Sequence, residues 1–451
     1  GADGIPNRPE TPTTSGLVVR LGGFFDFTMG NVQDSSDGAY FRNTQATATF
    51  NSTTGNMTAG TNTTAKGRQR NDFRTESEIN LYVDGIAANG MRYGAVFELQ
   101  MDNVVTPSGQ GSGTGVDYDE LYGFVKGSWG ELRFGQEDSA ASLMQVRRPS
   151  VLWMGTDDAW DEFTVNQPGG TPYIMSGMGD GNDASKIIYL SPQLAGFDVG
   201  FSYAPNRFEG EHFLTPTSNV NGNGLNQTFQ RDFGGLTNEI SAAIRYRGTF
   251  GPVGLATSFI AQFADAQRQQ SSGSPFLNNP QNVTAYSGGL VVRAYGFQVG
   301  GEYTWGNYNG SAPAGAALNK GLDGSSHWVG SGVYTIGALS LGAMYGKGTQ
   351  DNGTASGQFG QTQGAKLEDR EQSYLGFGVA YVLAPGMTLF ANYNQIQDKN
   401  IPLNGASVNS VGTTTIAGGG AGAGTTLAKF NANGSTTRDI TVLVAGVRVA
   451  F

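Results

Sequence analysis

The sequence predicts an all-β protein: a single transmembrane antiparallel β-barrel of about 16 strands that takes up residues 1–451. Three observations predict it: an alternating strand at the C-terminal end, a glycine-rich composition without long apolar runs, and a regular succession of tight turns and long polar loops. A soluble β-sandwich or jelly roll is the alternative, and it would need wholly apolar inner faces. Most of the predicted strands instead carry Arg, Glu, Asp or Gln on one face.

The C-terminal strand, residues 438–451, has two different faces. Leu443, Val447 and Phe451 belong to an apolar face, whereas Arg448 lies on the other face. Successive side chains of a strand point to opposite sides of the sheet. Such a strand fits a barrel wall that has lipid on one side and water on the other, with an aromatic residue at the interface.

The composition supports a barrel. Gly makes up 70 of the 451 residues and charged residues only 14%. No stretch of about 20 apolar residues is present, which excludes a transmembrane helix. A closed barrel can span a membrane while half of each strand stays polar. The chain has no Cys, so disulfides and thiolate metal sites are excluded, and its net charge of −10 argues against nucleic acid as a partner.

Short Gly-, Pro- or Asn-containing turns join pairs of alternating runs. These turns are predicted at 84–90, 127–130, 194–196, 251–252, 295–296, at Gly337 and at 384–386. The predicted strands are 17–29, 75–83, 91–101, 120–126, 131–137, 184–191, 197–204, 238–250, 253–264, 285–294, 297–305, 327–336, 338–347, 371–383, 387–397 and 438–451. The turns are typical of β-hairpins, and the number of strands is even, as a bacterial barrel requires.

The period of two also predicts which side chains face the interior. The inward charged residues include Arg20, Asp26, Arg74, Glu76, Glu78, Arg92, Glu98, Glu131, Arg133 and Glu137. An inner face charged over several neighbouring strands indicates a water-filled channel. Aromatic residues at strand ends or on outward faces, Phe390 among them, predict an interfacial girdle, and a sugar-guiding track inside the barrel is the alternative.

Three segments resemble the trimeric, 16-stranded general porins of Gram-negative bacteria. They are residues 121–136, residues 188–203 and the C-terminal strand that ends on Phe451. The resemblance implies a passive diffusion channel in the outer membrane and a third loop, residues 138–183, that folds into the barrel and narrows it. It also implies a homotrimer in contact with lipid and lipopolysaccharide that passes small hydrophilic solutes and ions. The Pro-Glu-Phe-Gly-Gly turn of enterobacterial porins is absent, and the nearest string is 167–170.

The predicted site is this constriction. Its loop acids are Asp157, Asp158, Asp161 and Glu162, and its wall residues are Arg20, Arg74, Arg92, Arg133 and Glu137. Acids facing arginines across a narrow lumen would create a transverse field that favours polar solutes. An ordinary solvated loop is the alternative for the four acids.

The acidic excess predicts a weak preference for cations, and the alternative is a substrate-specific channel for sugars or anions. No cofactor is expected. Calcium is the exception, because the same four loop acids suit a hard cation. The only two histidines, His212 and His327, show no triad pattern, so the sequence favours a channel over an enzyme.

Overall fold

The computed structural model describes residues 16–34, 48–51, 56–59, 70–101, 117–156, 160, 163–164, 175, 178, 184–206, 236–266, 280–308, 318–319, 324–354, 364–402 and 435–451. Sixteen strands form the wall of a barrel. They are β1 (Val18–Asp34), β4 (Asn71–Ile86), β5 (Arg92–Gln100), β6 (Asp117–Gly127), β7 (Gly130–Gln136), β8 (Ser185–Leu190), β9 (Phe197–Asn206), β10 (Leu236–Phe250), β11 (Val253–Ala266), β13 (Val283–Ala294), β14 (Phe297–Asn307), β16 (Gly324–Ile336), β17 (Leu339–Gln350), β18 (Arg370–Ala384), β19 (Met387–Pro402) and β20 (Ser435–Ala450). Each lies where the sequence predicted a strand.

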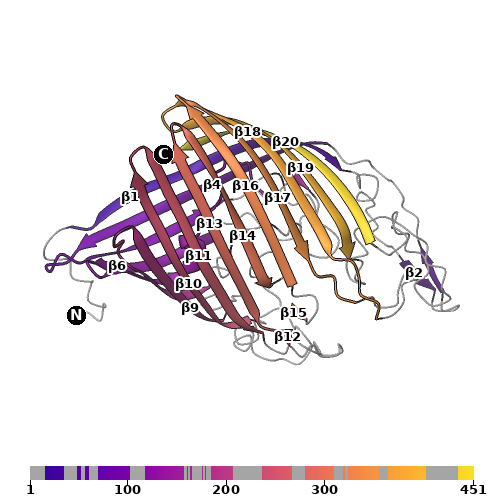
Figure 1. Ribbon diagram of the computed structural model, residues 1–451, viewed down its shortest axis with the longest axis horizontal. Coiled ribbons are helices and arrows are strands. Elements are labelled where there is room, and N and C mark those ends of the chain that lie inside the picture. Colours follow the sequence, from indigo (N-terminus) through magenta and orange to yellow (C-terminus); the bar gives the residue numbers. More distant parts are fainter. Residues whose placement is uncertain are drawn as a thin grey trace.

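The wall is a closed antiparallel barrel in the order β1-β20-β19-β18-β17-β16-β14-β13-β11-β10-β9-β8-β7-β6-β5-β4. Figure 1 shows these strands as tilted neighbours. Two small sheets are separate from the wall: β2 (Ala48–Asn51) with β3 (Asn56–Ala59), and β12 (Pro280–Gln281) with β15 (Leu318–Asn319). A short helix, α2 (Ala140–Met144), follows β7. Among the described residues, no helix is long and apolar enough to cross a membrane.

Tight turns join strands at one end of the barrel, here called the short-turn end, and the opposite end is called the long-loop end. Tyr295 and Gly296 have φ angles of 51° and 83°, and Ala195 and Gly196 have 50° and 92°. Two successive residues with positive φ give a hairpin turn whose twist matches that of the strands. All seven predicted tight turns join strands that pair with each other, so this part of the prediction is confirmed.

The two faces of the wall differ in exposure. On β1, Leu21 and Phe25 are exposed on the outer face, whereas Asp26 and Thr28 are buried on the inner face. This is the alternation that the sequence predicted. The placement of Phe390 in the outer girdle was wrong. Phe390 lies two residues from the inward Asn392 on β19, so it shares the inner face, where it is buried beside the Trp153 ring.

The segment after β7, with described residues 137–156, 160, 163–164, 175 and 178, lies along the inner side of the wall. Val146 donates its N–H to Ser258 Oγ on β11 at 2.8 Å, and Asn392 on β19 donates to the Leu152 carbonyl at 3.0 Å. Ser258 belongs to the inner face, because the next residue, Phe259, is exposed on the outer face. The described residues of the segment therefore follow the inner wall from β11 to β19.

Inner-face glycines make room for this segment. A Cβ on Gly289 would overlap the Val146 carbonyl oxygen, and a Cβ on Gly200 would overlap the Met144 sulfur. Glycine is the residue that permits so close an approach. Part of the high glycine content of the chain therefore serves the contact between the segment and the wall.

One side of the interior is an apolar core. Met154, Trp160 and Phe163 from the segment pack with Val442 and Val444 on the inner face of β20, and all five side chains are buried. The Trp153 ring lies beside this core, 6.4 Å from the Phe390 ring. The charged inner face predicted from the sequence is present on β1 and β4–β7. The β16–β20 side instead packs against the segment, which the strand period alone does not reveal.

Two ion pairs join the first strand to the last. Arg448 Nε lies 2.8 Å from Asp26 Oδ1, and these residues are directly opposite in the β1–β20 register. Nearer the other end of the two strands, Arg438 Nε lies 3.1 Å from Asp34 Oδ1 in a buried pair. Both pairs face the interior, so β1 and β20 are held by side chains as well as by backbone hydrogen bonds.

Candidate pore-lining site

The four predicted loop acids, Asp157, Asp158, Asp161 and Glu162, lie outside the described residues. Their role in a constriction, and calcium binding by them, therefore stay predictions. Two described residues next to them are buried: Thr156, which precedes Asp157, and Trp160, which lies between the two pairs of acids, have exposed fractions of 0% and 1%.

Two predicted wall residues, Arg133 and Glu137, contact each other. Arg133 Nη1 lies 3.0 Å from Glu137 Oε2, and its Nε lies 2.7 Å from Glu131 Oε1. The guanidinium also lies over the Tyr122 ring at 5.1 Å. A cation held by two carboxylates and a ring is a fixed charge on the lumen wall.

The other predicted wall arginines lie at different heights. Arg20 pairs with Asp84 at 2.7 Å close to the short-turn end, and Arg92 is the first residue of β5 at that same end. Arg74 pairs with Glu76 at 3.2 Å and lies opposite Thr28. Residues 20 and 28 are separated by roughly 26 Å along β1, at 3.3 Å per residue. The structure therefore does not bring the four arginines together in one ring.

A buried ion pair fixes the segment to the wall, and sequence reasoning missed it. Arg148 Nη1 lies 2.6 Å from Glu302 Oε1 on β14. Its Nη2 donates to Thr156 Oγ1 at 2.7 Å, and that hydroxyl donates to the Met175 carbonyl at 2.5 Å. One guanidinium thus ties two parts of the segment to one strand. The alternation of the strand could have predicted that Glu302 faces inward. It could not have predicted the partner of Glu302, because Arg148 lies in a loop, where side-chain directions follow no regular period.

Three acidic residues on neighbouring strands lie close together, and the sequence analysis did not predict this. They are here called the carboxylate cluster: Glu78 on β4, Glu98 on β5 and Asp119 on β6. One carboxylate oxygen from each lies within 4.8 Å of the others. Glu78 is opposite Phe24, on the same face as the inward Asp26. Carboxylates this close could share a divalent cation such as calcium. The signal available was the inward parity of Glu78 and Glu98 on consecutive strands.

A family comparison decides the class of protein. Residues 13–401 match the family model described as Gram-negative porin. The chain belongs to this family. The protein is therefore a porin, an outer-membrane diffusion channel, and its closed 16-stranded barrel agrees with this assignment. No curated protein matched the sequence.

Solved structures with the same fold cover nearly the whole porin. The outer membrane channel DcaP of Acinetobacter baumannii is 12% identical with a TM-score of 0.52, over 98% of this chain and 99% of that one. A loop L8 deletion mutant of OmpT, an outer membrane protein of Vibrio cholerae, is 10% identical with a TM-score of 0.51, over 96% and 99%. An anion-selective porin from Comamonas acidovorans is 13% identical with a TM-score of 0.49, over 96% and 100%. At these identities the likeness to the first two structures concerns the fold alone.

Proposed function

We propose that this porin is a general diffusion channel for small hydrophilic solutes and ions, with a weak preference for cations. The observation that carries the preference is the carboxylate cluster on the inner wall, with its oxygens within 4.8 Å of one another. Acids so close together share protons, and the negative charge that they keep creates a negative potential along the path of the solute. The net charge of −10 adds to it by concentrating cations at the mouths of the channel.

We further propose that Asp157, Asp158, Asp161 and Glu162 face the lumen and act with Arg133 at the narrowest point. Two observations support this. Thr156 and Trp160, which flank the first two acids, are buried among inner-wall contacts, and Arg133 is held in place by two carboxylates. Acids on one side and a fixed guanidinium on the other would orient water and ease the passage of polar solutes.

Reversal potentials across a KCl gradient in planar bilayers test the preference. We expect a potential of the sign that cation preference gives, and it should shrink as salt rises. The reason is screening, because the Debye length is ~30 Å at 0.01 M salt and ~10 Å at 0.1 M. A channel that prefers anions at low salt would contradict the proposal. Saturation of the flux of one sugar would instead favour the substrate-specific alternative.

Two sets of variants separate the wall from the loop. The wall variant is E78Q/E98Q/D119N, and the loop variant is D157N/D158N/D161N/E162Q. Each should move the reversal potential toward anions, since each removes acids from the solute path. Glu371→Gln is the matched control, because Glu371 pairs with Lys347 on the outer face. Unchanged selectivity in both sets would show that neither group of acids sets it.

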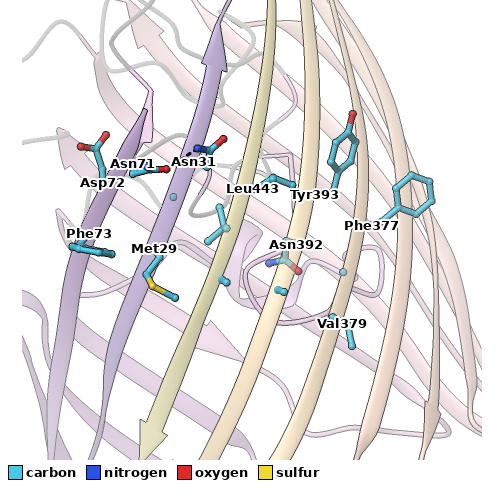
Figure 2. Close-up of a pocket in the computed structure, with 15 residues that line it drawn as sticks. Met29, Asn31, Asn71, Asp72, Phe73, Phe377, Val379, Asn392, Tyr393 and Leu443 are labelled. Carbon is cyan, nitrogen blue, oxygen red and sulfur yellow. Dashed lines mark hydrogen bonds between the residues drawn. The ribbon is translucent and has the colours of Figure 1, made fainter. Parts of the chain in front are cut away.

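We also propose that the porin is a homotrimer that uses the outer face of its first and last strands. A groove of about 820 Å³ crosses this face over β4, β1, β20, β19 and β18. Figure 2 shows Met29, Leu443, Phe377 and Tyr393 along it. On β1, Val19 and Leu21 are also exposed, with exposed fractions of 61% and 64%. A broad apolar hollow of this kind suits the protruding side chains of a second copy.

A further inference from the structure

A second hollow lies on the inner side of the wall, at the short-turn ends of β10, β11 and β13. Its volume is about 410 Å³, and Gln193, Arg247, Thr249, Gly254 and Arg293 are among its lining residues. Arg247 is opposite Ala256 on β11, two residues from the inward Ser258. The hollow therefore opens toward the lumen at the short-turn end of the channel.

Positive charge exceeds negative charge around this hollow. Asp198 binds two guanidinium groups, Arg245 Nη2 at 2.6 Å and Arg247 Nη2 at 3.0 Å. Arg293 donates through Nε to Gln298 Oε1, a neutral acceptor, at 3.0 Å. Three arginines against one aspartate leave a formal charge of 3 − 1 = +2. The Arg247 side chain remains 49% exposed, so part of its donor fork is open to a solute.

Small residues keep the space between the arginines open. Gly254 lies between Thr249 on one neighbouring strand and Arg293 on the other. A Cβ at this position would already be in van der Waals contact with the Arg293 Cβ, at 3.7 Å. A longer side chain here would fill the hollow, whereas Gly leaves room for a solute between two guanidinium groups.

The hollow also lies next to the segment that crosses the interior. Arg245, which shares Asp198 with Arg247, donates from Nη1 to the Leu143 carbonyl at 3.3 Å. Ser258, which accepts the Val146 N–H, is the next inward residue on β11 after those of the hollow. A solute that enters from the short-turn end therefore meets the hollow directly before it reaches the segment.

We propose that this hollow is a binding site for small anions that carry a carboxylate or phosphate group. Guanidinium groups recognise both through charge-assisted, often bidentate hydrogen bonds. Binding is weak and transient, because the site is open to solvent and a solute must leave it to be conducted. The site gives the channel a positive zone at the short-turn end, opposite in sign to the carboxylate cluster.

Partial block of the KCl current tests the site in planar bilayers, with inorganic phosphate or succinate added to one side at a time. With wild type we expect saturable block by both anions, and a lower half-saturating concentration when they are added from the short-turn side. In R247Q/R293Q the half-saturating concentration should rise roughly tenfold or more, the usual effect of losing hydrogen bonds to charged groups. Lys347→Gln, on the outer face, should leave it unchanged.

Absence of block in wild type, or equal block in wild type and R247Q/R293Q, would overturn the proposal. Should the double variant not form channels, Arg293→Gln alone gives the same readout, because the described partner of Arg293 is the neutral Gln298. Conductance in KCl without added anions is recorded in the same membranes. A channel without cation preference would contradict the proposed function and would still report on this site.

Discussion

At the scale of single residues, Arg148 connects the segment inside the barrel with the wall. It contacts Glu302 on the wall and Thr156 within the segment, and its side chain is 4% exposed. Burying two charges costs free energy that close pairing offsets. Removing one partner therefore leaves the other charge buried without its close counter-charge, which makes this pair a sensitive point of the interior.

Glu302→Gln should destabilise the porin by about 3 kcal/mol, the lower end of the range for losing one partner of a buried pair. It should also increase current fluctuations in single-channel records, since the segment loses its tie to β14. Denaturant unfolding in detergent measures the first effect. Glu371→Gln breaks an exposed pair, with side chains 44% and 41% exposed, and should change stability by less than about 1 kcal/mol. Equal effects of the two substitutions would argue against the role of Arg148.

The sequence allowed some of these residues to be identified in advance. Inward parity correctly predicted Arg133 and Glu137 on one face, and the structure places them in contact. It could not predict the pairing of Arg148 with Glu302, which are 154 residues apart in the chain. The alternation along a strand predicts which face of the wall a side chain occupies. The pairing of Arg148 with Glu302 depends instead on the path of a loop, which shows no regular alternation.

At the scale of elements, the segment and the wall fit because specific positions have no side chain. Gly289 faces the segment, whereas its neighbour Gly288 has no atom closer than 4.0 Å to a Cβ built on it. The two positions differ by one residue on one strand and lie on opposite faces of it. They form a matched pair for testing whether the segment depends on the glycines of the inner wall.

Gly289→Ala should shift the segment, because its Cβ would overlap the Val146 carbonyl oxygen. We expect a destabilisation of about 1–3 kcal/mol, as for other overpacked positions, together with altered single-channel conductance. Gly288→Ala should leave both unchanged. If Gly289→Ala also leaves conductance and stability at wild-type values, the segment does not lie as close to β13 as described.

The sequence predicted the strands of the wall better than it predicted the segment that packs against their inner face. Turn residues and alternation located all sixteen strands, but several strands extend farther at the long-loop end than predicted. β1 continues to Asp34 instead of Met29, for example, because its outward residues there, Asn31 and Gln33, are polar and no longer show the alternation. The helix α2 was not predicted, since its five residues are too few to show a helical period. The apolar core against β20 was not predicted, because the alternation along a strand does not show which part of the chain packs against its inner face.

At the scale of the whole molecule, the outer face varies around the barrel. The groove over β1, β20 and β19 contains small residues at its centre, where Ala445 lies between Met29 and Ala391 in the strand register. Elsewhere on the outer face, Val299 on β14 is 57% exposed. These two positions allow the proposed trimer interface to be tested against an outward position on a strand that does not line the groove.

Ala445→Trp should weaken the trimer, because the indole would occupy the groove that a second copy is proposed to fill. Val299→Trp adds the same ring on β14, which does not line the groove, and should leave the trimer intact. Light scattering in mild detergent gives the mass of each assembly. A monomeric wild type, or a trimer of unchanged stability in Ala445→Trp, would contradict this interface.

The ion pairs between β1 and β20 bear on how the barrel is completed during folding. Hairpin turns or loops within the chain connect every other neighbouring pair, but β1 and β20 meet only when the two ends of the chain come together. No turn sets the register of that last pairing. A slip of two residues would keep every face correct, yet it would separate Arg448 from Asp26, whose buried carboxylate would lose this counter-charge. The two ion pairs therefore favour one register of β1 against β20 when the barrel closes, a step at which backbone hydrogen bonds alone would allow several registers.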